Sequence, residues 1–166
     1  VVIPTYNEKE NISVLIDRLL SNLSSIKGAY EIIVVDDNSP DFTSGVVEQY
    51  ARIHHDIRLI RRVDKRDLSA ALALGFDSAK GEYLLAMDAD LQHEPSQVLK
   101  MLAAADNAEL VVATRYADQG HVENWNFMRR FISSAATRLT VNMLQTTCSD
   151  PLSGYFLLRR DIWQWV

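Results

Sequence analysis

The sequence predicts a single α/β domain, in which a mostly parallel sheet is covered by helices on both faces. Two observations predict this class. Short strand-like runs alternate with segments whose apolar residues recur at helical spacing. The runs are also apolar along most of their length, which is typical of strands buried on both faces. The 166 residues suffice for one domain with a substantial core.

The first half of the chain supplies three strands and three helices in alternation. Residues 1–3 form a strand, and Asn7 then caps a helix with Glu10 in a capping box. Residues 32–35 form a buried strand before a second helix around Val46 to Ala51. The basic run "IRLIRR" is a short strand, and an Ala-rich helix follows from Leu68 to Ala79.

The second half continues the alternation. "YLLAM" is a strand, and Pro95 opens a helix that runs to Ala105, with His93 at its start. "LVVAT" is a further strand, residues 118–126 are a polar loop, and residues 127–144 form an amphipathic helix. "DPLSGYFLLRR" gives a turn and a final strand.

Composition and charge argue against several classes of function and of structural feature. The net charge of -5 argues against nucleic acid as a partner, and a single cysteine excludes an internal disulfide. No segment reaches the roughly 20 apolar residues that span a bilayer, and no signal peptide is present. The chain opens in "VVIP" and stops in "IWQWV". We therefore interpret both ends as truncated, and a membrane segment in a longer parent protein remains compatible with the sequence.

Acidic side chains follow several of the predicted strands. In a parallel sheet these strand ends share one edge, where ligands of open α/β sheets bind. Helix capping is the alternative role for such residues, and we favour it for Asn7, Asp41 and Ser69. The carboxylates expected at the edge are Glu8, Asp36, Asp37, Asp88 and Asp90.

The Asp88-Ala89-Asp90 turn predicts a cation site. Side chains two residues apart can converge on one hard cation, and Mg²⁺ or Mn²⁺ takes carboxylates together with phosphate oxygens and water. Gln92 adds a possible carbonyl ligand. Neither a Gly-x-Gly-x-x-Gly turn nor a Walker lysine loop is present, which argues against dinucleotide dehydrogenases and P-loop enzymes.

Six motifs in order resemble the family 2 glycosyltransferases of GT-A fold. They are "VVIPTYNEKENI", "IIVVDDNSPDFT", "MDADLQHEP", "ATRY", "VENWNFMRRFIS" and "DPLSGYFLLRR". The last two resemble the dolichyl/polyprenyl-phosphate mannose synthase branch and its bacterial relatives. The resemblance covers essentially the whole chain and implies that residues 1–166 are one catalytic domain of GT-A, Rossmann-like fold.

The resemblance also implies roles for individual residues. Asp88, Asp90 and Gln92 match the metal and diphosphate site. Arg115 and Arg129, with Ser133 in the same motif, match the site of the acceptor phosphate. Asp90, Arg115 and Arg129 are the expected catalytic residues. Nucleotide binding is expected of Pro4, Tyr6, Glu8, Asp36, Asp37 and Asp88. One departure is Asp67-Leu68, where the family usually has Gly-Leu.

The implied reaction is inverting transfer of a hexose to a polyprenyl or dolichyl phosphate, with mannose from GDP-mannose as the favoured donor. It would take place at the cytoplasmic face of a membrane, with the protein peripheral or anchored by segments outside this chain. Three alternatives stay open. The donor could be a UDP-sugar. The acceptor could be a hydroxyl, with Asp150 as base. The chain could also bind nucleotide-sugars without catalysis.

Overall fold

A computed structural model describes residues 1–26, 28–63, 66–114, 150 and 153–165. Its centre is a six-stranded sheet in the order β3-β2-β1-β4-β6-β5. β1, β2, β3 and β4 are mutually parallel, whereas β6 runs antiparallel to both of its neighbours. The predicted fold class, a mostly parallel sheet with helices on both faces, is confirmed. The strands are Val2–Thr5 (β1), Ile32–Asp36 (β2), Ile57–Arg61 (β3), Tyr83–Ala86 (β4), Leu110–Val112 (β5) and Phe156–Arg159 (β6).

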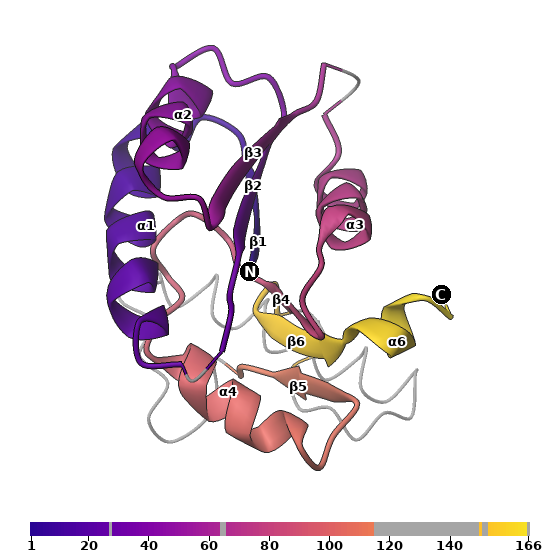
Figure 1. Cartoon of the computed structure of the whole chain (residues 1–166). Coiled ribbons are helices and arrows are strands. Elements are labelled where there is room, and N and C mark those ends of the chain that lie inside the picture. The colour runs from indigo at the N-terminus through magenta and orange to yellow at the C-terminus, as the bar shows by residue number, and fades with distance from the viewer. Residues whose placement is uncertain (27, 64–65, 115–149, 151–152, 166) are drawn as a thin grey trace, which may run out of the picture.

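Helices cover both faces of this sheet (Figure 1). On one face, strand residues such as Ile3 and Val34 join α1, α2 and α4 in a single buried cluster. On the other face, the alternate residues Val2, Ile33 and Val35 pack against α3 and α6. This period of two is what a strand buried on both sides requires. The helices are Lys9–Leu23 (α1), Thr43–Ile53 (α2), Leu68–Ser78 (α3), Gln97–Ala105 (α4) and Arg160–Trp163 (α6).

Helix starts differ from the sequence prediction at three places. Asn7 does not cap α1, because it adopts a left-handed φ of 60° and Glu8 occupies the N-cap without a side-chain cap bond. Ser69 lies inside α3, where Asp67 caps the helix by accepting a hydrogen bond from the Ala70 N–H. α4 begins two residues after Pro95, so His93 lies in the preceding loop.

Asp41 was expected to cap α2, but Phe42 holds the N-cap position and Asp41 precedes it. Its carboxylate accepts hydrogen bonds from the N–H and hydroxyl of Thr43 and from the Lys9 N–H. Burial opposes ionisation of Asp41, but these hydrogen bonds prevail and lower its pKa. The side chain therefore ties the start of α2 to the start of α1.

The amphipathic helix predicted at residues 127–144 and the loop at 118–126 lie outside the described residues. Among the helices that the structure describes, none combines the length and apolarity needed to cross a membrane.

Candidate functional site

The carboxyl ends of β1, β2 and β4 meet at one edge of the sheet, as the sequence predicted. β1 pairs with β2 up to Thr5 and Asp36, and the Met87 N–H donates to the Val2 carbonyl on β1's other side. The segments that follow β1 and β2 are joined directly, because the Asn7 N–H donates to Ser39 Oγ at 3.0 Å. This edge therefore gathers the residues after three different strands.

The antiparallel β6 adds residues that a purely parallel sheet would not bring here. Phe156 pairs with Ala86 on one side and with Val112 on the other. Continuing this register places Gly154 opposite Asp88. Ser153 Oγ donates to the Ala113 carbonyl at 2.8 Å and so fastens this turn to the end of β5.

Asp36 is fully buried and its carboxylate is held by protein donors. Thr5 Oγ1 donates to Oδ1 at 3.0 Å, and the Ser39 N–H donates to Oδ2 at 3.0 Å. The Ser39 hydroxyl also donates to Oδ1. These bonds satisfy the buried polar atoms of this side chain and fix the turn after β2. A direct contact of Asp36 with nucleotide stays a prediction.

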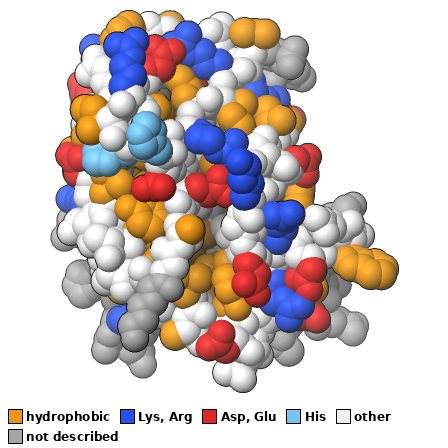
Figure 2. All heavy atoms as spheres, in the orientation of Figure 1, with side chains coloured by type: hydrophobic (Ala, Val, Ile, Leu, Met, Phe, Trp, Pro, Cys, Tyr) orange, Lys and Arg blue, Asp and Glu red, His pale blue; other side chains and the backbone are white. Residues whose placement is uncertain are grey.

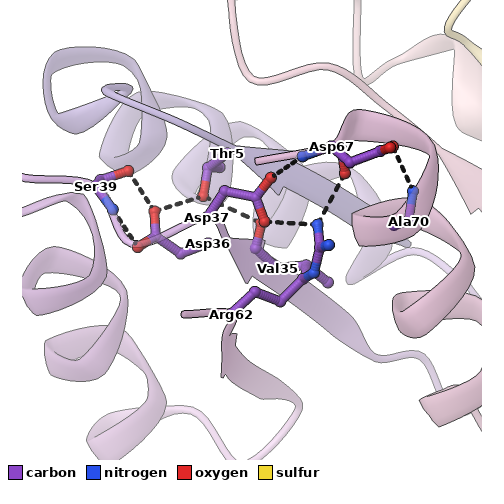
Figure 3. A network of polar contacts seen from close by, with 8 residues as sticks. All are labelled: Thr5, Val35, Asp36, Asp37, Ser39, Arg62, Asp67 and Ala70. Atoms are coloured by element: carbon purple, nitrogen blue, oxygen red, sulfur yellow. Dashed lines mark hydrogen bonds and ion pairs between the residues drawn. The ribbon is translucent and has the colours of Figure 1, made fainter. Parts of the chain in front are cut away.

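Asp37 faces away from Asp36 and binds the segment after β3 (Figure 3). Its Oδ1 accepts from Arg62 Nη1 at 2.7 Å, and its Oδ2 accepts from the Asp67 N–H at 3.0 Å. Arg62 Nη1 also donates to the Asp67 carbonyl at 2.8 Å. Both Asp37 oxygens are therefore engaged within the protein.

The remaining predicted nucleotide residues lie at or just after the end of β1. Pro4 belongs to β1, and Tyr6 follows it with Arg66 lying 4.0 Å from its ring centroid, a cation–π arrangement. Glu8 begins α1 and its Oε2 accepts a hydrogen bond from Asn11 at 2.8 Å. All three are partly accessible, as residues of a ligand site must be.

Asp88 is held between two residues that come from different directions. His93 Nε2 lies 3.4 Å from Asp88 Oδ2. A Cβ built on Gly154 would lie 2.6 Å from the same oxygen. The His93 ring in turn packs against Tyr155, with centroids 4.8 Å apart. The Asp88 side chain keeps 40% of its surface exposed, so it is confined yet accessible.

Asp90 and Gln92 follow in the same loop. Asp90 Oδ1 accepts from the Gln92 N–H at 3.0 Å, and Leu91 between them has a left-handed φ of 62°. A leucine in this region is uncommon and strained. Such strain is characteristic of functional loops, and here it sets the turn that carries both polar side chains.

Tyr155 is hydrogen-bonded to the backbone just after this loop, at Glu94. It is buried, and its hydroxyl donates to the Glu94 carbonyl at 3.1 Å. Burial, together with the nearby Glu94 carboxylate, raises the pKa of Tyr155 well above its usual value. The phenol therefore stays neutral and keeps the loop that follows Asp90 attached to the start of β6.

The donor set after β4 fits a divalent cation that is completed by a ligand. No group of three or more His, Cys, Asp or Glu side chains suited to a metal occurs among residues 1–26, 28–63, 66–114, 150 and 153–165. Asp88 and Asp90 give two carboxylates, and Mg²⁺ or Mn²⁺ is commonly held by one or two carboxylates plus substrate phosphates and water. The chemistry of these oxygens therefore fits the predicted metal.

Three predicted residues, Arg115, Arg129 and Ser133, lie outside the described residues, so their acceptor role stays a prediction. Sequence reasoning did not assign His93 or Gly154 to the site. The spacing of His93 five residues after Asp88 was a weak signal, whereas the role of Gly154 depends on how β6 pairs with β4. Figure 2 shows acidic and basic side chains interspersed on one face, without a broad basic field.

Comparison with known proteins identifies the family. Residues 1–165 match the family described as Glycosyl transferase family 2. The chain is 39% identical over 166 residues to the dolichol-phosphate mannosyltransferase of Pyrococcus furiosus, covering 98% of this chain and 46% of that protein. It is 41% identical over 162 residues to the Saccharomyces cerevisiae protein of that name, covering 96% and 60% respectively. The chain thus spans about half the length of these curated relatives.

Solved structures share the fold. Mannosyl-3-phosphoglycerate synthase from Rubrobacter xylanophilus superposes with a TM-score of 0.72 at 19% identity, covering 97% of this chain and 52% of that one. Glucosyl-3-phosphoglycerate synthase from Mycobacterium tuberculosis, solved with Mn²⁺ and UDP-glucose, gives a TM-score of 0.67 at 22% identity, covering 97% and 56%. The match along residues 1–165 shows that the chain belongs to glycosyl transferase family 2.

Proposed function

We propose that residues 1–166 form the catalytic domain of an inverting hexosyltransferase that uses a nucleotide-sugar and a polyprenyl or dolichyl phosphate. GDP-mannose is the proposed donor, because the relatives named dolichol-phosphate mannosyltransferase are 39% and 41% identical. The observation that carries the proposal is the confined, accessible Asp88 carboxylate at the edge where β1, β2 and β4 end.

Asp88, Asp90 and Gln92 are the residues proposed to hold Mg²⁺ or Mn²⁺. When bound, such an ion neutralises the negative charge that develops on the diphosphate leaving group. The protein itself holds the Asp88 side chain and the backbone at Asp90 and Gln92 in place. Asp88 is confined by His93 and Gly154, and the turn through Leu91 fixes the backbone between Asp90 and Gln92. Fixed ligands lose little freedom when the donor binds.

The acceptor side of the proposal depends on Arg115 and Arg129, with Ser133 nearby in sequence. A phosphate nucleophile is anionic at neutral pH and needs no general base, whereas a hydroxyl acceptor does. Guanidinium groups pair with phosphate in bidentate fashion and would hold it in line with the sugar C1. Asp150, the candidate base for a hydroxyl acceptor, has 0% exposure. Its burial favours the phosphate acceptor.

A lipid phosphate requires access to a membrane surface, and we propose the cytoplasmic face. Trp165 is 90% exposed near the end of α6, and tryptophan is enriched where proteins meet lipid headgroups. Vesicle sedimentation of the wild-type protein and of Trp165→Ala would test this point. Equal sedimentation of the two proteins would remove Trp165 from the proposed contact.

A thermal-shift panel tests donor and metal together. GDP-mannose with Mn²⁺ or Mg²⁺ should raise the Tm more than UDP-glucose or UDP-N-acetylglucosamine does. A larger shift with a UDP-sugar would replace the mannose assignment. The Asp90→Ala variant should lose the metal-dependent part of the shift, and an unchanged shift would place the metal elsewhere.

A transfer assay then separates catalysis from binding. Radiolabelled mannose from GDP-mannose should enter an extractable polyprenyl phosphate product. Arg129→Ala should bind the donor as the wild-type protein does and transfer sugar at least about 100-fold more slowly, because one charge-assisted phosphate contact is lost. Donor binding without transfer by the wild-type protein would favour a non-catalytic nucleotide-sugar-binding domain.

A further inference from the structure

Arg62, the residue after β3, is attached to the end of β2 by a buried ion pair with Asp37. Arg62 and Asp37 keep only 10% and 6% of their side-chain surfaces exposed, and their atoms approach to 2.7 Å. Figure 3 shows the Asp37 carboxylate meeting both Arg62 and the backbone of Asp67. Asp37 thus binds both Arg62, which follows β3, and Asp67, which precedes α3.

Arg62 and Asp67 each make a further hydrogen bond that fixes their position. The Arg62 N–H donates to the Asp36 carbonyl at 2.8 Å, so Arg62 extends the β2–β3 pairing. At the other end, Asp67 caps α3 through the Ala70 N–H at 3.0 Å. Arg62 is therefore fixed to the sheet, and Asp67 is fixed to the start of α3. A glycine at position 67 would keep the backbone bonds and lose this cap.

Arg66, the residue before Asp67, lies beside Tyr6 at the sheet edge where β1 ends. Its guanidinium carbon lies 4.0 Å from the centroid of the Tyr6 ring, after β1. Arg66 is exposed, and no ion pair involving it occurs within the described part of the chain. A guanidinium resting on an aromatic face keeps its edge N–H groups available to an anion.

We propose that Arg66 binds the nucleoside diphosphate of the donor, and that Asp37 and Arg62 are positioning residues that hold Arg66 over Tyr6. The inference rests on the proposed function and adds one donor-binding residue to it. In this proposal Asp37 acts through Arg62 and Asp67, whose N–H groups donate to its two carboxylate oxygens.

Isothermal titration with GDP and Mn²⁺ tests the proposal with Arg66→Ala, Asp37→Asn, their double variant and a control variant, Glu31→Gln. Arg66→Ala should weaken GDP binding about tenfold, the loss of one cationic contact. Asp37→Asn should weaken it several-fold. The double variant should be no weaker than Arg66→Ala, because both changes remove the same contact.

Glu31→Gln is the matched control. Glu31 and Arg58 form a 2.8 Å ion pair on the same two strand regions, at the opposite end of the sheet. This variant should bind GDP as the wild-type protein does. If Asp37→Asn folds poorly, as its loss of Tm would reveal, Arg66→Ala still carries the test because its side chain is exposed.

The outcomes are distinct. GDP affinity of Arg66→Ala within twofold of wild type would overturn the inference, as would effects of Asp37→Asn and Arg66→Ala that multiply in the double variant. A wild-type protein that binds neither GDP nor UDP with metal would overturn the proposed function itself. Wild-type binding together with unaffected variants would overturn the inference alone.

Discussion

Replacing Gly154 with alanine should damage the proposed metal site at Asp88 while leaving the fold intact. The added Cβ would lie 2.6 Å from Asp88 Oδ2. To reach the 3.4 Å of an ordinary contact, that oxygen must withdraw by about 0.8 Å. Gly154 itself is not in a left-handed conformation, so alanine introduces no backbone strain, and the three atoms nearest to its Cβ all belong to Asp88.

The size of the expected loss in affinity follows from the displacement of the Asp88 carboxylate. Rotating a side chain about 30° from its preferred rotamer costs roughly 0.5–1.5 kcal/mol. Metal–ligand distances tolerate deviations of only about 0.2 Å. We therefore expect the Mn²⁺-dependent affinity for GDP to fall by about tenfold. Stability should change little, because alanine stabilises by about 0.4–1 kcal/mol through the unfolded state and the displaced atom ends a side chain.

Isothermal titration of GDP with and without Mn²⁺, beside a thermal melt, measures both quantities. The control is Gly28→Ala, whose Cβ would meet no described atom within 4 Å. It should match wild type in affinity. If Gly154→Ala retained wild-type Mn²⁺-dependent affinity, Asp88 would not be a metal ligand confined by this glycine. Equal losses with and without Mn²⁺ would also contradict the reasoning.

Three further predictions concern stability. In urea denaturation, Gly75→Ala should destabilise the protein by about 1–2 kcal/mol, because its Cβ would lie 2.3 Å from Val2 Cγ1 and overpacking outweighs the gain in helix propensity; adding Val2→Ala should restore part of the loss. Burial opposes ionisation of Glu31, but hydrogen bonds from the Lys80 and Gly81 N–H groups and from Arg58 prevail and lower its pKa below the ordinary 4.5. Its stabilisation is therefore complete above pH 4.5 and is lost as pH falls further, so acid melts of Glu31→Gln should decline less steeply than those of wild type. The raised pKa of Tyr155 means that its contribution is complete below its ordinary value of 10 and is lost as pH rises above it; ultraviolet titration should show this phenol ionising only with alkaline unfolding, and a Tyr155→Phe difference spectrum lacking any late phase would contradict this.

The sheet and its polar edge were predictable from local patterns. Asp36 ends β2 and Asp88 follows β4 by two residues. Both carry their own signal, because a buried apolar run must stop where polar side chains begin. Helix starts were less predictable. Asn7 is a residue type typical of N-caps, yet the contact of its N–H with Ser39 placed it in the loop before α1. That contact joins segments far apart in sequence, and helix propensity contains no information about it.

The amino-acid sequence by itself determined the fold class, the family motifs and the acidic pair after β4. These depend on spacing along one chain, where periodicity and turn chemistry act locally. The tertiary structure alone decided that Asp37 turns toward Arg62 while Asp36 turns toward Ser39, and that Gly154 lies against Asp88. Both depend on which strands become neighbours. The antiparallel insertion of β6 beside β4 brings residues 66 positions apart into contact, and long-range pairing of that kind leaves no local pattern to read.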